Sequence, residues 1–207
     1  MIIKELEKND RISVETANTQ NTNTISVYGK NIDNTSIDLD MAVRLKNIET
    51  NWTLYEVQRD QEYLIQEFSD ETLAQLALYI AVSSYFNQEK PSTDVKKKLR
   101  AFETDLDAAN NYLSTKIGHE YYSFFQNKTD CINLQQNDNG LYDIYYLTPS
   151  NSRITISEDR KLPNAFVVVY NYSVYLKQFM ERIYPSLSAY ELSSPQLDVL
   201  KRIYLKK

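Results

Sequence analysis

The sequence predicts an α+β fold in which two related units, each an antiparallel sheet with a helix, share one core. Three observations support this: apolar and polar residues alternate in the N-terminal third, two apolar runs have helical length, and one pattern recurs about 90 residues later. A period of two marks strands, and longer apolar runs mark helices. We expect one domain over residues 1–207, with a central amphipathic helix and a short C-terminal helix.

Strands dominate the first third of the chain. The segments with strand character are residues 11–15, 24–28, 37–41, 52–57 and 63–65. Alternating side chains of a strand point to opposite faces of the sheet, so Ile37, Leu39 and Met41 share one face. We place a turn between the last two strands, at Asp60 and Gln61.

Two helices follow the strands. The first is expected after Phe68, with Ser69 as its N-cap and an apolar run through Val82 that calls for burial on several sides. The second covers residues 92–125 and is amphipathic. Its apolar residues recur at spacings of three and four: Val95, Leu99, Phe102, Leu106, Ala109 and Leu113.

An internal duplication relates residues 37–90 to residues 131–184. Four pairs match at offsets of 90 or 91 residues: Trp52 with Tyr142, Tyr55 with Tyr145, Ala74 with Ala165, and Tyr79 with Tyr170. By this analogy the run after Ala165 is a helix, although its β-branched residues favour a strand. A final short helix is expected over residues 195–205, where Leu197, Leu200 and Ile203 share one face.

Composition excludes several classes of function. The chain has 207 residues, a net charge of −5 and a pI near 5.0, which disfavours general nucleic-acid binding. One cysteine and one histidine rule out a disulfide framework, a multi-thiolate zinc site and most catalytic triads. The glycines are isolated, so no phosphate-binding loop is present. We therefore predict no enzymatic activity, no cofactor and no metal site.

Targeting and membrane signals are missing from the chain. The N-terminus becomes charged at once, unlike a signal peptide, and no apolar run approaches the roughly 18–20 residues that span a bilayer. We expect a cytoplasmic protein without a membrane partner, and the oligomeric state stays open.

Two features predict a binding surface. The chain contains 17 tyrosines, a residue type favoured at interfaces, and residues 1–90 carry a net charge of −7 against +2 for residues 91–207. An acidic, strand-rich half suits a basic partner. The candidate contact residues are Asp38, Asp40, Glu56, Glu62 and Glu67, with Tyr121, Tyr122 and Tyr145 as aromatic anchors.

One segment resembles a known bacterial family. It has Trp52, Tyr55 and Arg59 in the spacing W-x-L-Y-x-x-x-R, then a strand ending at Phe68, an acidic helix start and Ala74 opening an apolar helix. This pattern is similar to that of immunity proteins of polymorphic-toxin systems, which bind and neutralise a cognate toxin in the cytosol. Gln58 and Asp60 depart from the family's usual Glu and Gly. The pattern is largely structural, so the resemblance transfers no binding residues.

The leading hypothesis is therefore a non-enzymatic immunity protein that blocks a toxin domain stoichiometrically. The expected partner is basic, as a nuclease or a toxin acting on NAD or nucleotides would be. One alternative is a scaffold or regulatory module of phage or mobile-element origin. A second is an enzyme using carboxylates and His119, with or without Cys131. DNA binding has the least support, from Lys96–Lys98 and the tail Lys201–Lys207.

Overall fold

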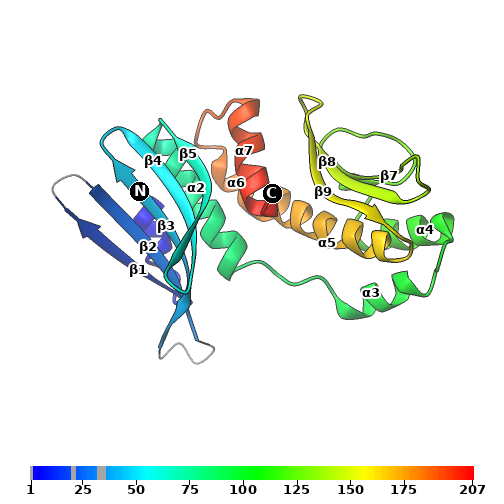
Figure 1. Ribbon diagram of the computed structural model, residues 1–207, viewed down its shortest axis with the longest axis horizontal. Coiled ribbons are helices and arrows are strands. Elements are labelled where there is room, and N and C mark those ends of the chain that lie inside the picture. The colour runs from blue at the N-terminus through cyan, green and yellow to red at the C-terminus, as the bar shows by residue number, and fades with distance from the viewer. Residues whose placement is uncertain (1, 20–21, 32–35) are drawn as a thin grey trace. The chain divides into compact units, whose positions relative to one another are not determined.

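An antiparallel sheet with the strand order β1-β2-β3-β4-β5, here called sheet A, organises the first of two compact units in the computed structural model (Figure 1). The structure describes residues 2–19, 22–31 and 36–207. The units span residues 1–87 and 88–207. The predicted α+β class is confirmed. The single domain with a shared core stays a prediction.

The first unit contains all of the strands predicted in the N-terminal third. Its elements are α1 (Ile2–Leu6), β1 (Ile12–Asn18), β2 (Thr22–Lys30), β3 (Ile37–Ile48), β4 (Asn51–Gln58), β5 (Gln61–Phe68) and α2 (Glu71–Phe86). β3 is longer than predicted. The turn between β4 and β5 lies at Arg59 and Asp60, one residue earlier than predicted. Both have left-handed φ angles, 48° and 64°, as a two-residue type I′ turn requires.

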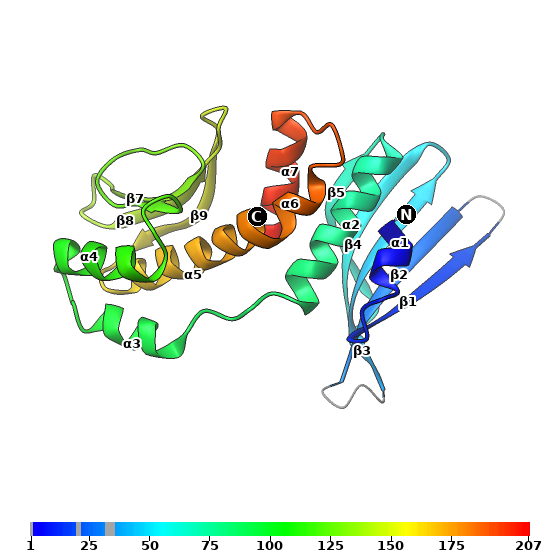
Figure 2. The same cartoon turned by 180° about the vertical axis from the view of Figure 1, so that it is seen from behind.

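In the described part of the first unit, the helices pack against one face of sheet A. α2 packs against β3, β4 and β5, and α1 packs against α2 and β1 (Figure 2). Beneath them, Val43, Leu45 and Leu54 are fully buried. These residues alternate with polar ones that point to the opposite face. Sequence alternation thus decides which face of the sheet the helices cover.

The N-cap of α2 is Asp70 rather than the predicted Ser69. A carboxylate oxygen of Asp70 accepts a hydrogen bond from the backbone N–H of Leu73 at 2.6 Å. An ionised cap satisfies one of the unpaired N–H groups of the first turn and also interacts favourably with the helix dipole. The carboxylate therefore provides a stronger cap here than the neighbouring hydroxyl.

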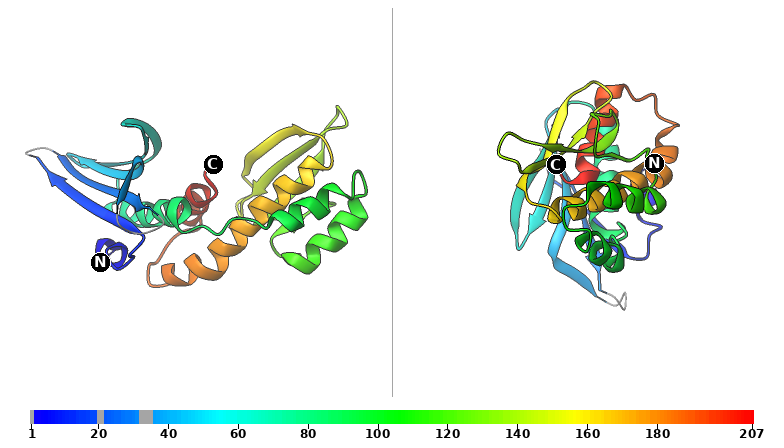
Figure 3. Two further views of the ribbon diagram at one scale, coloured as in Figure 1. Left: turned by 90° about the horizontal axis from the view of Figure 1, so that it is seen from below. Right: turned by 90° about the vertical axis from the view of Figure 1, so that its right-hand side faces the viewer.

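The second unit is built around sheet B, with the strand order β6-β7-β8-β9. Its elements are α3 (Thr93–Arg100), α4 (Leu106–Lys116), β6 (Tyr122–Ser123), β7 (Cys131–Gln136), β8 (Tyr142–Leu147), β9 (Arg153–Arg160), α5 (Asn164–Gln178), a π-helical turn η1 (Phe179–Ile183), α6 (Tyr184–Leu187) and α7 (Ser194–Leu205). β6 pairs with β7 in parallel, and the other neighbours pair antiparallel. α5 lies along one face of β7, β8 and β9 (Figure 3).

The single helix predicted over residues 92–125 is wrong. The chain forms two helices, α3 and α4, separated by residues 101–105, and then the short strand β6. Glu103 has a left-handed φ of 54°, and Asp105 starts α4 by accepting the N–H of Ala108 at 2.9 Å. The apolar residues on both sides of the break still reach one core, in which Leu99 and Leu113 are fully buried.

The other helix predictions in the second unit hold. α5 is a helix despite its valine-rich start. α7 spans Ser194–Leu205, close to the predicted residues 195–205, and Ser193 and Gln196 form a capping box at its start.

The two hairpin–helix segments share a structural irregularity. The register of β4 with β5 shifts between Leu54 and Tyr55, and a register shift of β8 with β9 falls between Ile144 and Tyr145. These positions are 90 residues apart, the offset that relates the two halves in sequence. Ancestry by duplication stays a prediction, but the shared irregularity agrees with it.

The Asp70→Ala variant is expected to lower the free energy of unfolding of the first unit by about 1 kcal/mol, because the cap hydrogen bond is lost. Trp52 is the single tryptophan of the chain and lies in β4, so its fluorescence in urea follows this unit. The matched control is Ser69→Ala, for which we expect a change within about 0.5 kcal/mol. A larger loss of stability for Ser69→Ala than for Asp70→Ala would show that Ser69 is the cap.

Candidate partner-binding surfaces

The hairpin end of sheet A carries two of the carboxylates predicted to bind a partner. Asp38 and Asp40 are both exposed at the start of β3. A side-chain oxygen of Asp38 accepts the backbone N–H of Asp40 at 3.0 Å, and the carbonyl of Asp40 accepts the N–H of Arg59 at 3.0 Å. Among the residues that the structure describes, neither aspartate forms an ion pair. Their charges are therefore available to a partner.

An open hollow of about 540 Å³ adjoins these carboxylates. Its lining residues are Asp40, Gln58, Arg59, Gln61 and Tyr63. The hydroxyl of Tyr63 donates a hydrogen bond to the side-chain oxygen of Gln61 at 2.8 Å, which orients the ring at the rim. The hollow is polar and shallow rather than enclosed, so it suits a side chain of a macromolecule better than a buried small ligand.

Large apolar side chains are exposed beside the acidic groups. Leu39 is 68% exposed, Leu64 61%, Tyr63 49% and Ile37 37%. Ile37, Leu39 and Tyr63, together with Asp38, Asp40, Arg59 and Asp60, form a surface that we call the acidic end of sheet A. Leu64 points to the opposite face of β5 from Tyr63. Exposed apolar groups interleaved with charges are typical of protein-binding surfaces, because apolar contact supplies affinity and charge supplies orientation.

The remaining carboxylates predicted as contacts lie apart from this end. Glu62 lies on the face of sheet A that α2 leaves uncovered, where it forms ion pairs with Arg44 and Lys46, both at 2.7 Å. Burial raises the pKa of Glu62, but the hydrogen bonds and charges of Lys46 and Arg44 outweigh it and leave the pKa below its usual range. The charge of Glu62 is thus neutralised inside the unit.

Glu56 and Glu67 also occupy separate positions. Glu56 is half-buried on the helix-facing side of β4, where it accepts the hydroxyl of Tyr85 at 2.6 Å. Glu67 is exposed near the far end of β5. The predicted acidic set therefore does not form one cluster, and only Asp38 and Asp40 lie together.

The expected exposure of Tyr122 and Tyr145 is wrong. Each is only 2% exposed. The hydroxyl of Tyr122 donates to the carbonyl of Asn110 at 2.8 Å, and burial raises its pKa to about 12. These two side chains belong to the packing of the second unit and cannot anchor a partner as they stand.

Tyr121 is half-buried and held in place. Its hydroxyl donates to Glu181 at 3.2 Å, and the amine of Lys177 lies 5.6 Å from its ring centroid. Desolvation, followed by the charge and hydrogen bond of Glu181, raises the pKa of Tyr121 to about 12. It is the member of the aromatic set that keeps a partly accessible ring.

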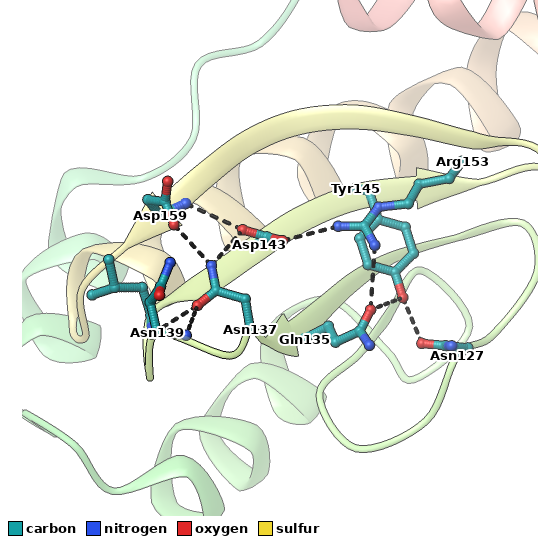
Figure 4. A network of polar contacts seen from close by, with 9 residues as sticks. Asn127, Gln135, Asn137, Asn139, Asp143, Tyr145, Arg153 and Asp159 are labelled. Atoms are coloured by element: carbon teal, nitrogen blue, oxygen red, sulfur yellow. Dashed lines mark hydrogen bonds and ion pairs between the residues drawn. The ribbon is translucent and has the colours of Figure 1, made fainter.

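A polar network on the outer face of sheet B explains the burial of Tyr145 (Figure 4). The guanidinium of Arg153 stacks on the ring of Tyr145, 3.9 Å from its centroid, and the Tyr145 hydroxyl donates to Asn127 at 2.5 Å. Arg153 also pairs with Asp143 at 3.2 Å. Arg153 thus lies over a ring and beside a carboxylate, which fixes its orientation.

The second half of the network ties the β7–β8 turn to β9. The amide nitrogen of Asn137 donates to Asp143 at 3.2 Å and to Asp159 at 2.8 Å, while its oxygen accepts the N–H groups of Asn139 and Leu141. Sequence reasoning missed this network and Arg153. The available signal was the spacing of Tyr145 and Arg153 across a hairpin, which puts them on one face of neighbouring strands.

Cys131 and His119 show no nucleophile–base arrangement. The thiol of Cys131 is buried and donates to the carbonyl of Glu120 at 2.9 Å, and burial raises its pKa to about 11. A protonated thiol is a poor nucleophile. The ring of His119 is stacked on that of Tyr122 at 5.9 Å.

A buried lysine forms a second polar cluster in this unit. The side chain of Lys201 in α7 is 1% exposed, and its amine lies 2.5 Å from a carboxylate oxygen of Asp130, which also accepts the Tyr146 hydroxyl at 2.5 Å. Asp198, one turn earlier in α7, is 8% exposed, and its Oδ1 has no hydrogen-bond partner. A buried ion needs a partner, so the Asp130–Lys201 pair fixes where α7 docks.

No group of three or more metal-ligating side chains is found in the described part of the chain. No helix there is both long enough and apolar enough to cross a membrane. Comparisons with protein-family models, with curated proteins and with solved structures find no match.

The Asp198→Asn variant is expected to be more stable than the wild type at neutral pH. Burial, the largest effect, raises the pKa of Asp198 above its unfolded value near 3.8, although Lys201 acts in the opposite direction. The folded state therefore binds the proton more tightly, and this contribution is lost as the pH rises through the raised pKa. Thermal unfolding followed by circular dichroism should show the two proteins converging near pH 4 and separating toward pH 7.

The matched control for this prediction is Glu191→Gln, which neutralises an exposed carboxylate. Its difference from the wild type should change little over the same pH range. A gap between Asp198→Asn and the wild type that stays constant with pH would contradict the assignment.

Proposed function

We propose that this chain is a non-enzymatic binding protein, an immunity protein that neutralises a cognate bacterial toxin in the cytoplasm by covering the toxin's active site. The observation that carries the proposal is the acidic end of sheet A. There, exposed and unpaired carboxylates lie among exposed apolar side chains around an open hollow. Such a surface fits a basic cleft, as a nuclease or a toxin acting on NAD or nucleotides presents.

Charge distribution supports a basic partner. Residues 1–87 carry a net charge of −7, whereas residues 88–207 carry +2. Some carboxylates elsewhere are paired internally, as at Glu62 and Asp143. A partner that bound at those positions would have to break existing ion pairs. At Asp38 and Asp40 it would not, because these carboxylates form no ion pair among the described residues.

The sequence resemblance supports the same function through the fold. Trp52 and Phe68 are cross-strand neighbours, Arg59 lies in the tight turn, and Ala74 is fully buried in the first turn of α2. The motif therefore builds the β4–β5–α2 segment and, apart from Arg59, leaves the acidic end free to vary. An immunity protein needs this freedom, because each one must fit its own toxin.

The direct test is co-expression with the protein encoded beside it. We expect rescue of cell growth and a 1:1 complex by size-exclusion chromatography with light scattering. A complex without rescue would favour the scaffold alternative. Absence of both complex and rescue would remove the proposal.

Charge reversal at the acidic end is expected to slow association. The double variant Asp38→Lys, Asp40→Lys should reduce the association rate constant roughly tenfold or more at low salt, because steering depends on the field of the surface. The difference should shrink as ionic strength rises. Stopped-flow or surface plasmon resonance measures it.

The matched control carries the same change of charge in the second unit. Glu158→Lys with Glu191→Lys alters two exposed carboxylates outside sheet A. Equal slowing by both pairs would mean that only net charge matters and would contradict a contact at Asp38 and Asp40.

A further inference from the structure

The last strand of sheet A has an open edge. β5 pairs with β4 and has no neighbour on its other side in the part of the chain that the structure describes. The two-residue turn is closed by the pair Gln58–Gln61, so alternate residues from Gln61 onward bond to β4. The intervening residues Glu62 and Leu64 direct their N–H and C=O groups to the open edge. Those groups can pair with another extended chain.

The first half of this edge is open to pairing. Natural edge strands are blunted by charged side chains, proline, bulges or short length, and the register shift at Leu54 and Tyr55 puts such a bulge into the second half of β5. β5 is eight residues long, contains no lysine, arginine or proline, and exposes Tyr63 and Leu64 on its two faces. At the other edge of the sheet, β1 has a mostly polar sequence, with Ile12 buried and Val14 half-buried. The two edge strands of the sheet therefore differ, because only β5 exposes large apolar side chains.

The acidic residues near β5 favour a basic segment as the occupant of its open edge. The strand itself carries Glu62 and Glu67, of which Glu62 is already paired with Arg44 and Lys46. The hairpin end adds Asp38, Asp40 and Asp60 against Arg59. A second copy of the chain would bring the same unpaired carboxylates to this edge, and like charges disfavour that pairing, whereas a basic segment is attracted to them.

We propose that the edge of β5 is a docking site for an extended basic segment of the partner, which adds a sixth strand to sheet A. Backbone hydrogen bonds to Glu62 and Leu64 supply affinity, and side chains on the two faces of the added strand meet Tyr63 and Leu64. The partner's identity rests on the proposed function, whereas the chemistry of the edge does not.

The test uses the full chain, labelled with ¹⁵N, and an alternating lysine–valine peptide of about the length of β5. We expect the amide protons of Glu62 and Leu64 to exchange with solvent roughly tenfold more slowly when the peptide is bound, because they become hydrogen-bonded. Added salt should weaken the effect. The acidic counterpart, alternating glutamate and valine, should give no protection.

A pair of variants at one position separates backbone pairing from side-chain contact. Leu64→Pro removes one outward N–H and should weaken peptide binding roughly tenfold, because proline cannot donate to a ladder. Leu64→Ala keeps that N–H and should bind within about threefold of the wild type. Trp52 fluorescence confirms that both variants keep the fold, and the exchange measurement on the wild type stands without them.

Several results would overturn the proposal. They are protection at β1 equal to that at β5, equal binding of the acidic peptide, or a stable dimer formed through β5. Full rescue from the neighbouring toxin by Leu64→Pro would also remove the edge from toxin recognition. If the peptide binds at β5 but the chain gives no rescue, the docking site is supported and only the proposed function is contradicted.

Discussion

The one-sided burial of sheet A by α2 is the constraint on which the first unit depends. α2 is apolar on nearly every side and is held against β3, β4 and β5, with α1 packed against it as well. Within the described part of this unit the helices cover one face of the sheet, and the other face carries polar side chains that satisfy one another. Arg44, Lys46 and Glu62 do this by bridging two strands. These ion pairs satisfy the charges on that face within the unit, whereas the ends and the open edge of the sheet keep unpaired groups.

Sequence periodicity predicted which residues face a core better than it predicted where an element ends. The apolar spacing from Val95 to Leu113 is correct, since these residues pack into one core, yet the chain breaks between α3 and α4. Spacing reports the direction of a side chain and is preserved when two helices lie on the same core. The break depends on Glu103 adopting a left-handed backbone and on Asp105 capping α4, which are local choices that apolar periodicity does not contain.

The candidate site was predictable only where exposure followed from strand position. Asp38 and Asp40 lie at a strand end beyond the helix cover, and they are exposed as expected. Tyr145 faces away from the core as an alternating pattern implies, since Ile144 and Tyr146 face inward, but it is buried all the same. The covering groups are Arg153, from the next strand, and Asn127, from the loop before β7. A side chain that points away from the core can still be buried by a loop and by one stacked cation. The sequence of the strand itself indicates neither of them.

Carboxylates in this protein fall into two groups with different consequences for binding. Glu62, Asp130 and Asp143 each have a cationic partner within the same unit, so a new partner must compete with an existing ion pair. Asp38 and Asp40 form no ion pair among the described residues. Asp40 bonds to Arg59 in the β4–β5 turn, which leads into the edge strand β5. A basic partner of Asp38 and Asp40 would displace water rather than another side chain. An exposed carboxylate keeps much of its hydration in a wet interface. Such charges contribute more to the rate of encounter than to final affinity. In the proposed complex, tight binding depends on the backbone pairing and apolar contact that β5 offers, so the acidic end would speed encounter and the strand edge would hold the partner.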